Sequence, residues 1–443
     1  MPVLVTVLRP QAIVERPWLA CCIGAGSPAK FAVVKGAGMR EKQAIQRTEQ
    51  VRKCATSGQY PGVYAVSATA LRAVPTLVQL MRSLPLRLLP LVSLLVPAFA
   101  QAQDAPKYSN EFLTIGVGAR SLGMGYSYVS SANDVTAGYW NPAGLLGVKG
   151  DLQVGAMHSE YFAGIAKYDY IGIAKPIDSV STLGISFVRF GVDDIPNTTD
   201  LIDNNGNLDY DRITSFSAAD NAFLISYARK LKVPGLRFGA NAKVIYRKVG
   251  PFAKAWGFGL DGGLQYDKGN WRFAAMGRDI TGTFNAWSYT LDQRTQDVFA
   301  QTGNELPVNG VEITLPRMVL GVARQFKFGA KLDMIAEVDM ENTFDGKRNT
   351  LIASDTWSGD PRLGIEVGYA HVVYLRAGVN NFQYVTDIND KKSLNFQPNI
   401  GLGLKIKSVA LDYALTDIGD NSVALYSNVF SLRFDLFKKP TGS

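Results

Sequence analysis

The sequence predicts an all-β protein: a membrane-spanning antiparallel β-barrel of about fourteen strands, preceded by an N-terminal segment folded into its lumen. Three observations predict this class. Apolar and polar residues alternate from Asp151 onward, the links between the alternating segments are short and long in turn, and a secretory signal lies upstream. The composition agrees, because 43 Gly, 22 Phe and 19 Tyr favour strands joined by tight turns.

The alternation is clearest in single segments. Along 332–340 the residues Leu, Met, Ala, Val and Met occupy every second position, and the polar positions beside them include Lys331, Asp333, Glu337 and Asp339. This period of two is typical of a strand with one apolar face. We predict such strands near 151–160, 166–177, 180–192, 222–232, 236–248, 256–267, 270–280, 316–326, 330–341, 362–371, 373–381, 399–407, 408–417 and 427–437.

The links between these strands follow a pattern that distinguishes two architectures. Turns such as Asp178–Ser179 and Lys407–Ser408 are short, and they alternate with longer links at 193–221, 249–255, 281–315, 342–361, 382–398 and 418–426. The alternation by itself would also fit a soluble β-sandwich. The loop asymmetry and the strand length favour an up-and-down membrane barrel with short periplasmic turns and long external loops. Such a sheet must close, and an even strand number places both termini in the periplasm.

The N-terminus carries the features of a signal peptide. Residues 81–102 hold a short basic region with Arg82 and Arg87, an apolar run, and small residues near a cleavage site. We therefore predict that 1–80 is an over-called, disordered upstream segment and that translation starts at Met81; a genuine extension is the alternative. The expected order is then signal peptide 81–102, hatch 103–150, barrel 151–437 and tail 438–443.

Charge and cysteine content exclude several functions. Residues 1–80 carry ten Lys and Arg against three Asp and Glu, so the net charge of +8 belongs to the N-terminus and the barrel is close to neutral. A nucleic-acid partner is therefore not expected. The three cysteines also lie in the first 80 residues, which excludes disulfides, thiol catalysis and cysteine metal sites from the barrel.

The segment Gly116 to Gly147 is Gly-rich and fits neither helix nor strand throughout. The glycine spacing is not that of a dinucleotide fingerprint, and no GK[ST] follows, so a phosphate loop is not predicted. Small residues that allow close packing in a confined lumen are the better interpretation. We expect Arg120 and Asp134 to pair with ionic residues of the lumen, and Trp140-Asn141-Pro142 to turn the chain into the first strand.

Other candidate sites are weak. His158 and His371 have no catalytic or metal-binding partner at a recognisable spacing, and interfacial or turn positions explain them. The acidic loop Asp200–Asp211 lacks the calcium-loop spacing, so a solvated loop is favoured over a calcium site. Most tryptophans fall near strand ends, where they would form an interfacial girdle or line a path for a hydrophobic ligand; they are Trp256, Trp271, Trp287 and Trp357.

The hatch motif carries a resemblance to a known family. In order, Gly118-Ala-Arg-Ser-Leu-Gly-Met-Gly125, Asp134 and Trp140-Asn-Pro-Ala-Gly-Leu145 resemble the PorV/PorQ outer-membrane proteins of Bacteroidetes, which are similar to FadL-like fatty acid transporters. The resemblance covers about 110–437. It implies a FadL-like barrel of fourteen strands with a luminal hatch, located in the outer membrane of a Gram-negative cell, and a role in type IX protein secretion.

Three functions follow from these observations. The first is a non-enzymatic secretion component that binds translocon and cargo proteins through loops 193–221, 281–315 and 342–361. The second is a FadL-like transporter of hydrophobic small molecules, and the third is a purely structural barrel. We expect contact with outer-membrane lipid, a possible hydrophobic ligand or detergent in the lumen, and no cofactor or metal. The residues expected to form the site are Gly118, Arg120, Ser121, Gly123, Met124, Gly125, Asp134, Trp140, Asn141, Pro142 and Gly144.

Overall fold

A computed structural model describes residues 109–202, 207–386, 390–416, 418 and 426–437. The predicted upstream segment, signal peptide and tail lie outside these residues. The strands are β1 (Leu152–Tyr161), β2 (Ala166–Pro176), β3 (Ser181–Asn197), β4 (Thr214–Lys230), β5 (Leu236–Val249), β6 (Ala253–Lys268), β7 (Trp271–Arg278), β8 (Thr283–Tyr289), β9 (Gly310–Thr314), β10 (Arg317–Phe328), β11 (Leu332–Thr343), β12 (Ile352–Ala353), β13 (Ser358–Tyr369), β14 (Val373–Thr386), β15 (Lys392–Ile406), β16 (Val409–Thr416) and β17 (Ser427–Leu436). The helices are η1 (Glu111–Leu113), α4 (Ala119–Gly123), α5 (Ala137–Trp140), η2 (Pro142–Gly147), η3 (Tyr210–Arg212) and α6 (Gln293–Gln301). None of the helices among these residues is long and apolar enough to cross a bilayer.

The strands form a closed antiparallel barrel. Most strands pair with the next along the chain. Around the interruptions, β6 pairs with both β7 and β8, β8 with β9, β7 with β10 and β11 with β13, and β17 pairs back with β1. The ring has fourteen members when β7 with β8, and β9 with β10, each count as one interrupted strand and β12 is left out. The predicted class, the strand number and the closure are confirmed.

The two faces of the wall differ as the alternation predicts. Along β6, Trp256, Phe258 and Leu260 point outward and are exposed, whereas the positions between them are buried. On β11, Asp333, Glu337 and Asp339 point into the lumen, and Val338 points outward. Lys331 lies in the turn before β11 and is exposed, so it is not the luminal ion that the sequence suggested. An apolar outer belt around a polar, filled lumen is the arrangement of a membrane-spanning barrel.

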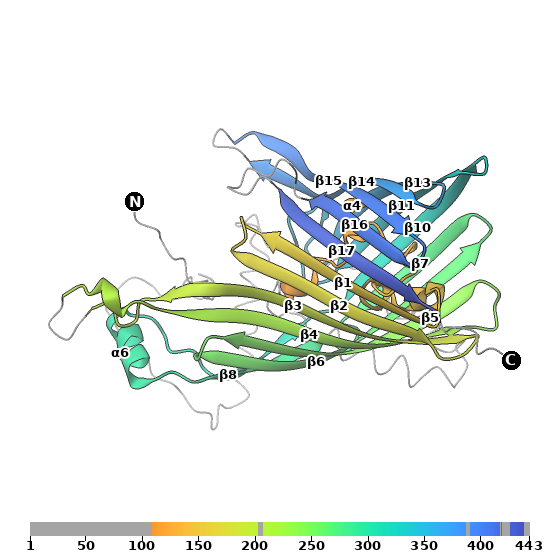
Figure 1. Cartoon of the computed structure of the whole chain (residues 1–443). Coiled ribbons are helices and arrows are strands. Elements are labelled where there is room, and N and C mark those ends of the chain that lie inside the picture. Colours follow the sequence, from red (N-terminus) through yellow and green to blue (C-terminus); the bar gives the residue numbers. More distant parts are fainter. Residues whose placement is uncertain (1–108, 203–206, 387–389, 417, 419–425, 438–443) are drawn as a thin grey trace, which may run out of the picture. The chain divides into compact units, whose positions relative to one another are not determined.

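The described part of the hatch, residues 109–150, lies inside the barrel (Figure 1). Its α4 packs against β14–β17, and its η2 packs against β3–β6. Its apolar side chains, among them Leu122, Tyr128 and Trp140, form one buried cluster with Tyr168 of the wall. The hatch therefore fills the lumen and reaches opposite sides of the wall.

The long links differ from the prediction at several points. Residues 249–255 are not a long link, because β5 ends at Val249 and β6 begins at Ala253. The link 281–315 contains β8, α6 and β9, and the link 342–361 contains β12. β3 and β4 continue well into the predicted loop, and a bulge between Val192 and Ile195 keeps them paired.

These longer strands build a projection at the long-loop end. The ribbons of β3, β4, β6 and β8 extend past the neighbouring strands, with α6 close to their far end (Figure 1). We call this projection the arm, comprising residues 193–202, 207–217 and 283–314 with the ends of β5 and β6 that carry them. Arg294 of α6 ties it together, since its guanidinium donates to the carbonyl of Ile202 at 2.6 Å.

Candidate functional site: the hatch and the adjacent wall

Arg120 is the principal ionic anchor of the hatch. Its Nε and Nη2 donate to the two carboxylate oxygens of Glu366 on β13 at 2.7 and 2.8 Å. Its Nη1 donates to Asn133 at 2.8 Å and to the Tyr128 hydroxyl at 3.1 Å. Glu366 also accepts from Arg376 of β14 at 2.6 Å. The bidentate geometry fixes both the position and the orientation of α4 against the wall.

Asp134 holds the other side of the hatch. It pairs with Arg433 of β17 and lies 3.9 Å from Arg120 Nη1. Burial alone would raise the pKa of this carboxyl, but Arg433 and Arg120 together with hydrogen bonds from Thr136 outweigh it, and the pKa lies below the ordinary 3.8. Burial likewise opposes the charge of Arg120, yet Glu366, Tyr128 and Asp134 together outweigh it and raise the pKa of Arg120. Both groups are therefore charged at neutral pH.

Two further carboxylates hold the hatch backbone, and sequence reasoning placed them only as luminal ions. Asp339 accepts the amides of Tyr128 and Val129 at 2.7 and 3.0 Å. Glu337 accepts the amide of Ser130 at 2.6 Å and that of Ser131 at 3.2 Å. Glu337 and Asp339 are two positions apart on β11, so the sequence could predict that both face the lumen. Their hydrogen-bond partners could not be predicted, because these depend on the fold of the hatch.

Glycines bring the hatch into direct backbone contact with the wall. A Cβ on Gly125 would lie 2.5 Å from the amide nitrogen of Val379, and one on Gly123 would lie 2.9 Å from the Cα of Gly401. The wall is matched to this approach, because a Cβ on Gly378 would lie 2.1 Å from the carbonyl carbon of Met124. No side chain larger than hydrogen fits at these positions without moving backbone.

The remaining motif residues stabilise the hatch internally. Ser121 donates to the carbonyl of Val117 at 2.6 Å, and the Trp140 indole donates to the same carbonyl at 2.7 Å. Gly118 has φ +89°, and a Cβ on Gly144 would lie 2.2 Å from the carbonyl of Ala132. The expected role of Trp140-Asn141-Pro142 in entering the first strand is wrong, since η2 begins at Pro142 and β1 only at Leu152.

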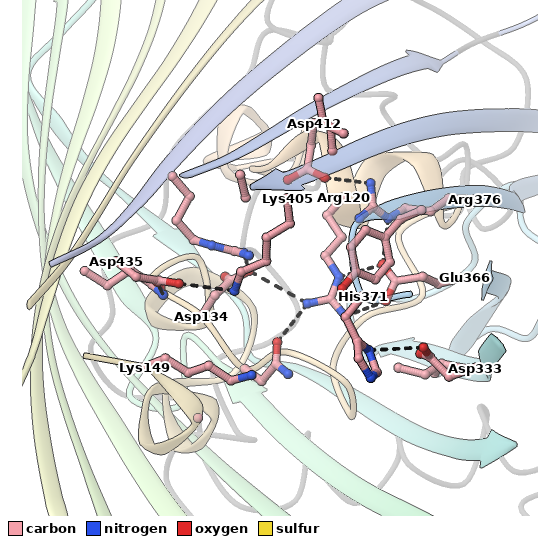
Figure 2. A pocket seen from close by; sticks show the side chains of 18 of the residues that line it. Arg120, Asp134, Lys149, Asp333, Glu366, His371, Arg376, Lys405, Asp412 and Asp435 are labelled. Carbon is pink, nitrogen blue, oxygen red and sulfur yellow. Dashed lines mark hydrogen bonds and ion pairs between the residues drawn. The ribbon is translucent and has the colours of Figure 1, made fainter. Parts of the chain in front are cut away.

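A polar cavity of about 240 Å³ lies beside these anchors (Figure 2). Figure 2 shows Arg120 and Arg376 converging on Glu366, and Lys405 of β15 reaching Asp435 of β17 at 3.2 Å. Lys149 and Arg272 also line the cavity and form no ion pair or hydrogen bond with another described residue. The cavity suits water and small polar solutes rather than an apolar ligand.

The wall is interrupted at one level on two neighbouring strands. Residues 279–282 separate β7 from β8, and residues 315–316 separate β9 from β10. Asp279 has φ 55°, and Pro316 has no amide hydrogen to donate, so neither segment can continue the ladder. We call residues 279–282 and 315–316 the wall break.

A buried ion cluster supports the wall break from the lumen. The Lys243 ammonium lies 2.7 Å from Asp261 and 2.5 Å from Asp279, and its side chain is 3% exposed. The Asp279 amide donates to Asp261 at 2.8 Å, and the Thr283 hydroxyl donates to Asp279. The cluster thus links β5, β6 and the break by charge-assisted hydrogen bonds.

An apolar crevice of about 460 Å³ lies outside the wall break. Its lining is apolar apart from two arginines and includes Phe238, Leu264, Ile280, Pro316 and Phe344. Glycines make the wall thin here: Gly263 lines the crevice, and a Cβ on it would lie 2.1 Å from Oδ1 of Asn141 in the hatch. Arg278 and Arg317 line both this crevice and a small cavity on the luminal side.

The start of the hatch is fastened to the wall break. Ser109 and Asn110 hydrogen-bond the Thr314 hydroxyl at 2.7 and 2.6 Å. Glu111 accepts from Arg317 at 2.5 Å. Arg278 donates to the carbonyl of Leu113 at 3.3 Å. These hydrogen bonds connect the start of the described hatch to the residues on either side of the wall break.

The weaker candidates take the positions of structural residues. His158 lies on the outer face of β1 beside Asp169 at 2.7 Å, and His371 lies in the β13–β14 turn. No metal-binding cluster of His, Cys, Asp or Glu occurs among the described residues, and part of the acidic loop 200–211 lies outside them. Trp256 and Trp271 are exposed, but Trp287 points inward onto Arg247 and is not part of an outer girdle.

Comparisons with known proteins give structural neighbours only. No family model matches the chain, and no curated protein matches it. Among solved structures, it is similar to the CymD monoaromatic hydrocarbon channel (12% identity, 73% of this chain and 98% of the other, TM-score 0.45). It is also similar to the Pseudomonas putida toluene transporter TodX (14%, 73% and 99%, 0.44) and to a Pseudomonas aeruginosa FadL homologue (13%, 72% and 98%, 0.42). None of these comparisons links the chain to PorV or PorQ proteins, and at these identities and TM-scores they do not indicate what it binds.

Proposed function

We propose that this protein is a transporter of hydrophobic small molecules in the outer membrane, in which the hatch closes the lumen and the wall break connects it to the bilayer. The observation that carries this proposal is the apolar crevice at the wall break. Its volume of about 460 Å³ is within the range of ligand pockets, and its polar groups are few.

The arrangement of the crevice suits passage through the wall. The apolar lining on the outer side stabilises a bound apolar solute, since burial of apolar surface contributes roughly 25 cal/mol per Å² to binding. On the luminal side, Arg278 and Arg317 hold residues 111–113 of the hatch in place. Movement of the hatch start would therefore change the wall at the position where the solute binds.

Filling the crevice is expected to reduce transport. Ala275 lies on the outer face of β7 and lines the crevice, so Ala275→Trp would occupy it without touching the ion cluster. We expect uptake of a fluorescent hydrophobic probe into cells or liposomes to fall about tenfold. Ala336→Trp is the matched control, because Ala336 also faces outward, on β11, and does not line the crevice. Equal uptake by both variants and the wild type would refute the proposal.

A second candidate is a PorV-like component of type IX secretion, and the arm favours it. The arm exposes apolar side chains outside the outward rows of Trp256 and Phe258, including Val308 at 81% and Leu208 at 60%. Exposed apolar groups beside polar ones are typical of protein interfaces. Under this hypothesis the tagged barrel co-purifies with translocon and cargo proteins. Val308→Asp/Leu208→Asp abolishes this, while Leu394→Asp, an exposed position in the link 382–398 outside the three contact loops, does not. Failure of the wild type to capture either protein would exclude the hypothesis.

A further inference from the structure

Two lysines face each other on the outside of the barrel, at the base of the arm. Lys248 of β5 and Lys254 of β6 are directly paired, and both are exposed. Like charges opposite one another in an antiparallel pair repel. Ser288 of β8 continues the row beside Lys254. Neither ammonium forms an ion pair or hydrogen bond with another described residue, so the row offers two unneutralised cations and a hydroxyl.

Several other charges on the outer faces of β1 to β3 are neutralised. His158 lies 2.7 Å from Asp169, and Lys167 lies 3.4 Å from Asp193. The neighbour of Lys248 on β4 is Ala219, which supplies no counter-charge. The lysine pair therefore differs from its surroundings in lacking an anion.

The position of the pair defines its height in the membrane. The next outward row holds Tyr246 and Trp256, whose rings are 4.6 Å apart, and Trp256 is 56% exposed. The row after that holds Phe258 and Phe284, both exposed. Aromatic residues concentrate at the boundary of the hydrocarbon, so the lysines lie at the height of lipid headgroups.

We propose that Lys248, Lys254 and Ser288 bind the phosphate of a lipid A-type glycolipid, whose acyl chains cover Phe258 and Phe284. Charge complementarity selects a phosphate, and the apolar strip directly below the lysines selects a lipid over a free anion. The site lies on the outer face of the sheet, apart from the crevice, and does not depend on the proposed transport function.

Native mass spectrometry of the purified full chain with bisphosphorylated lipid A tests the proposal. The wild type is expected to retain the lipid, and Lys248→Gln/Lys254→Gln to bind it about tenfold or more weakly, since lysines near a membrane surface attract anionic headgroups. Lys268→Gln is the matched control, because Lys268 is exposed at the opposite end of β6 and lacks a partner among the described residues. Heat-modifiable migration on gels verifies that each variant is folded.

Two further measurements distinguish the lipid from other sources of phosphate. Inorganic phosphate at millimolar concentration is expected not to displace the lipid, and dephosphorylated lipid A is expected to bind as weakly as the double variant does with intact lipid A. The proposal is overturned if the double variant binds like the wild type, if Lys268→Gln weakens binding equally, if free phosphate displaces the lipid, or if dephosphorylated lipid A binds fully.

Discussion

Lys243→Met is expected to destabilise the barrel by about 3–5 kcal/mol, because it removes the cation that pairs with the buried carboxylates of Asp261 and Asp279, and no other described cation forms an ion pair with either. Asp261 and Asp279 each lie within 2.7 Å of the Lys243 ammonium. Without that ammonium, two like charges face each other away from water, and the Asp279 carboxylate keeps only the Thr283 hydroxyl as a donor among the described residues. The measurement is the urea midpoint for unfolding in detergent or lipid vesicles.

The same substitution is expected to increase transport of a hydrophobic probe in the molecules that fold, since the wall break is no longer tied to β5. A second substitution, Asp279→Asn in the Lys243→Met background, removes one of the two unpaired charges and should recover part of the lost stability. Lys268→Met serves as the control, because Lys268 is exposed and has no described partner. A Lys243→Met midpoint equal to that of the wild type would show that the cluster does not stabilise the wall break.

The strands could be predicted from sequence because the lipid on one side and the filled lumen on the other impose an alternation of period two. Each of the fourteen predicted strands corresponds to a ring strand. The ends of the strands were less predictable. Asp193, Asp194 and Pro196 indicate a loop, yet β3 continues through them because a bulge accommodates the extra residues. The helix α6 was missed, although Asp292 caps it by accepting the Thr295 amide at 2.7 Å, a pattern visible in the sequence.

The partners within the site could not be predicted for a different reason. Alternation indicates that Glu366, Arg376 and Arg433 face one side of their strands, but which of them meets Arg120 depends on barrel register and on the path of the hatch. The wall break had no sequence signal beyond Pro316 and Gly282, which also occur in ordinary loops. The glycines of the hatch were more informative than these polar residues. The sequence predicted that they allow close packing, and in the structure they lie against glycines of the facing strands.

Hatch and wall break act together in this structure, since residues 109–113 bind the wall break while α4 binds the opposite wall. Releasing one attachment leaves the other in place. If the hatch moves in the proposed transport, it can therefore swing from either end, and Arg120 is the ionic attachment at the α4 end. This reasoning makes the Arg120 anchor the second place where a single substitution should have a large effect.

Arg120→Ala should loosen the hatch more than any other change in the motif. It removes two hydrogen bonds to Glu366 and two within the hatch, and its side chain is 14% exposed. Breaking a buried ion pair costs about 3–5 kcal/mol, although Glu366 keeps Arg376 as a partner and the cost should lie near the lower value. We expect hydrogen exchange of the amides of residues 128–131 to accelerate about a hundredfold, since 1.4 kcal/mol corresponds to a factor of ten. Conductance in planar bilayers should rise in parallel.

Arg272→Ala is the control for this experiment, because Arg272 lines the same cavity and has no described partner. Arg120→Lys keeps the charge but cannot form the bidentate contact, so it should give an intermediate exchange rate. A structural barrel with a permanently fixed hatch would behave differently: Arg120→Ala would lower the unfolding midpoint while exchange in the hatch and conductance stayed at the wild-type level. That outcome would remove hatch movement from the transport mechanism and leave the wall break as its only moving part.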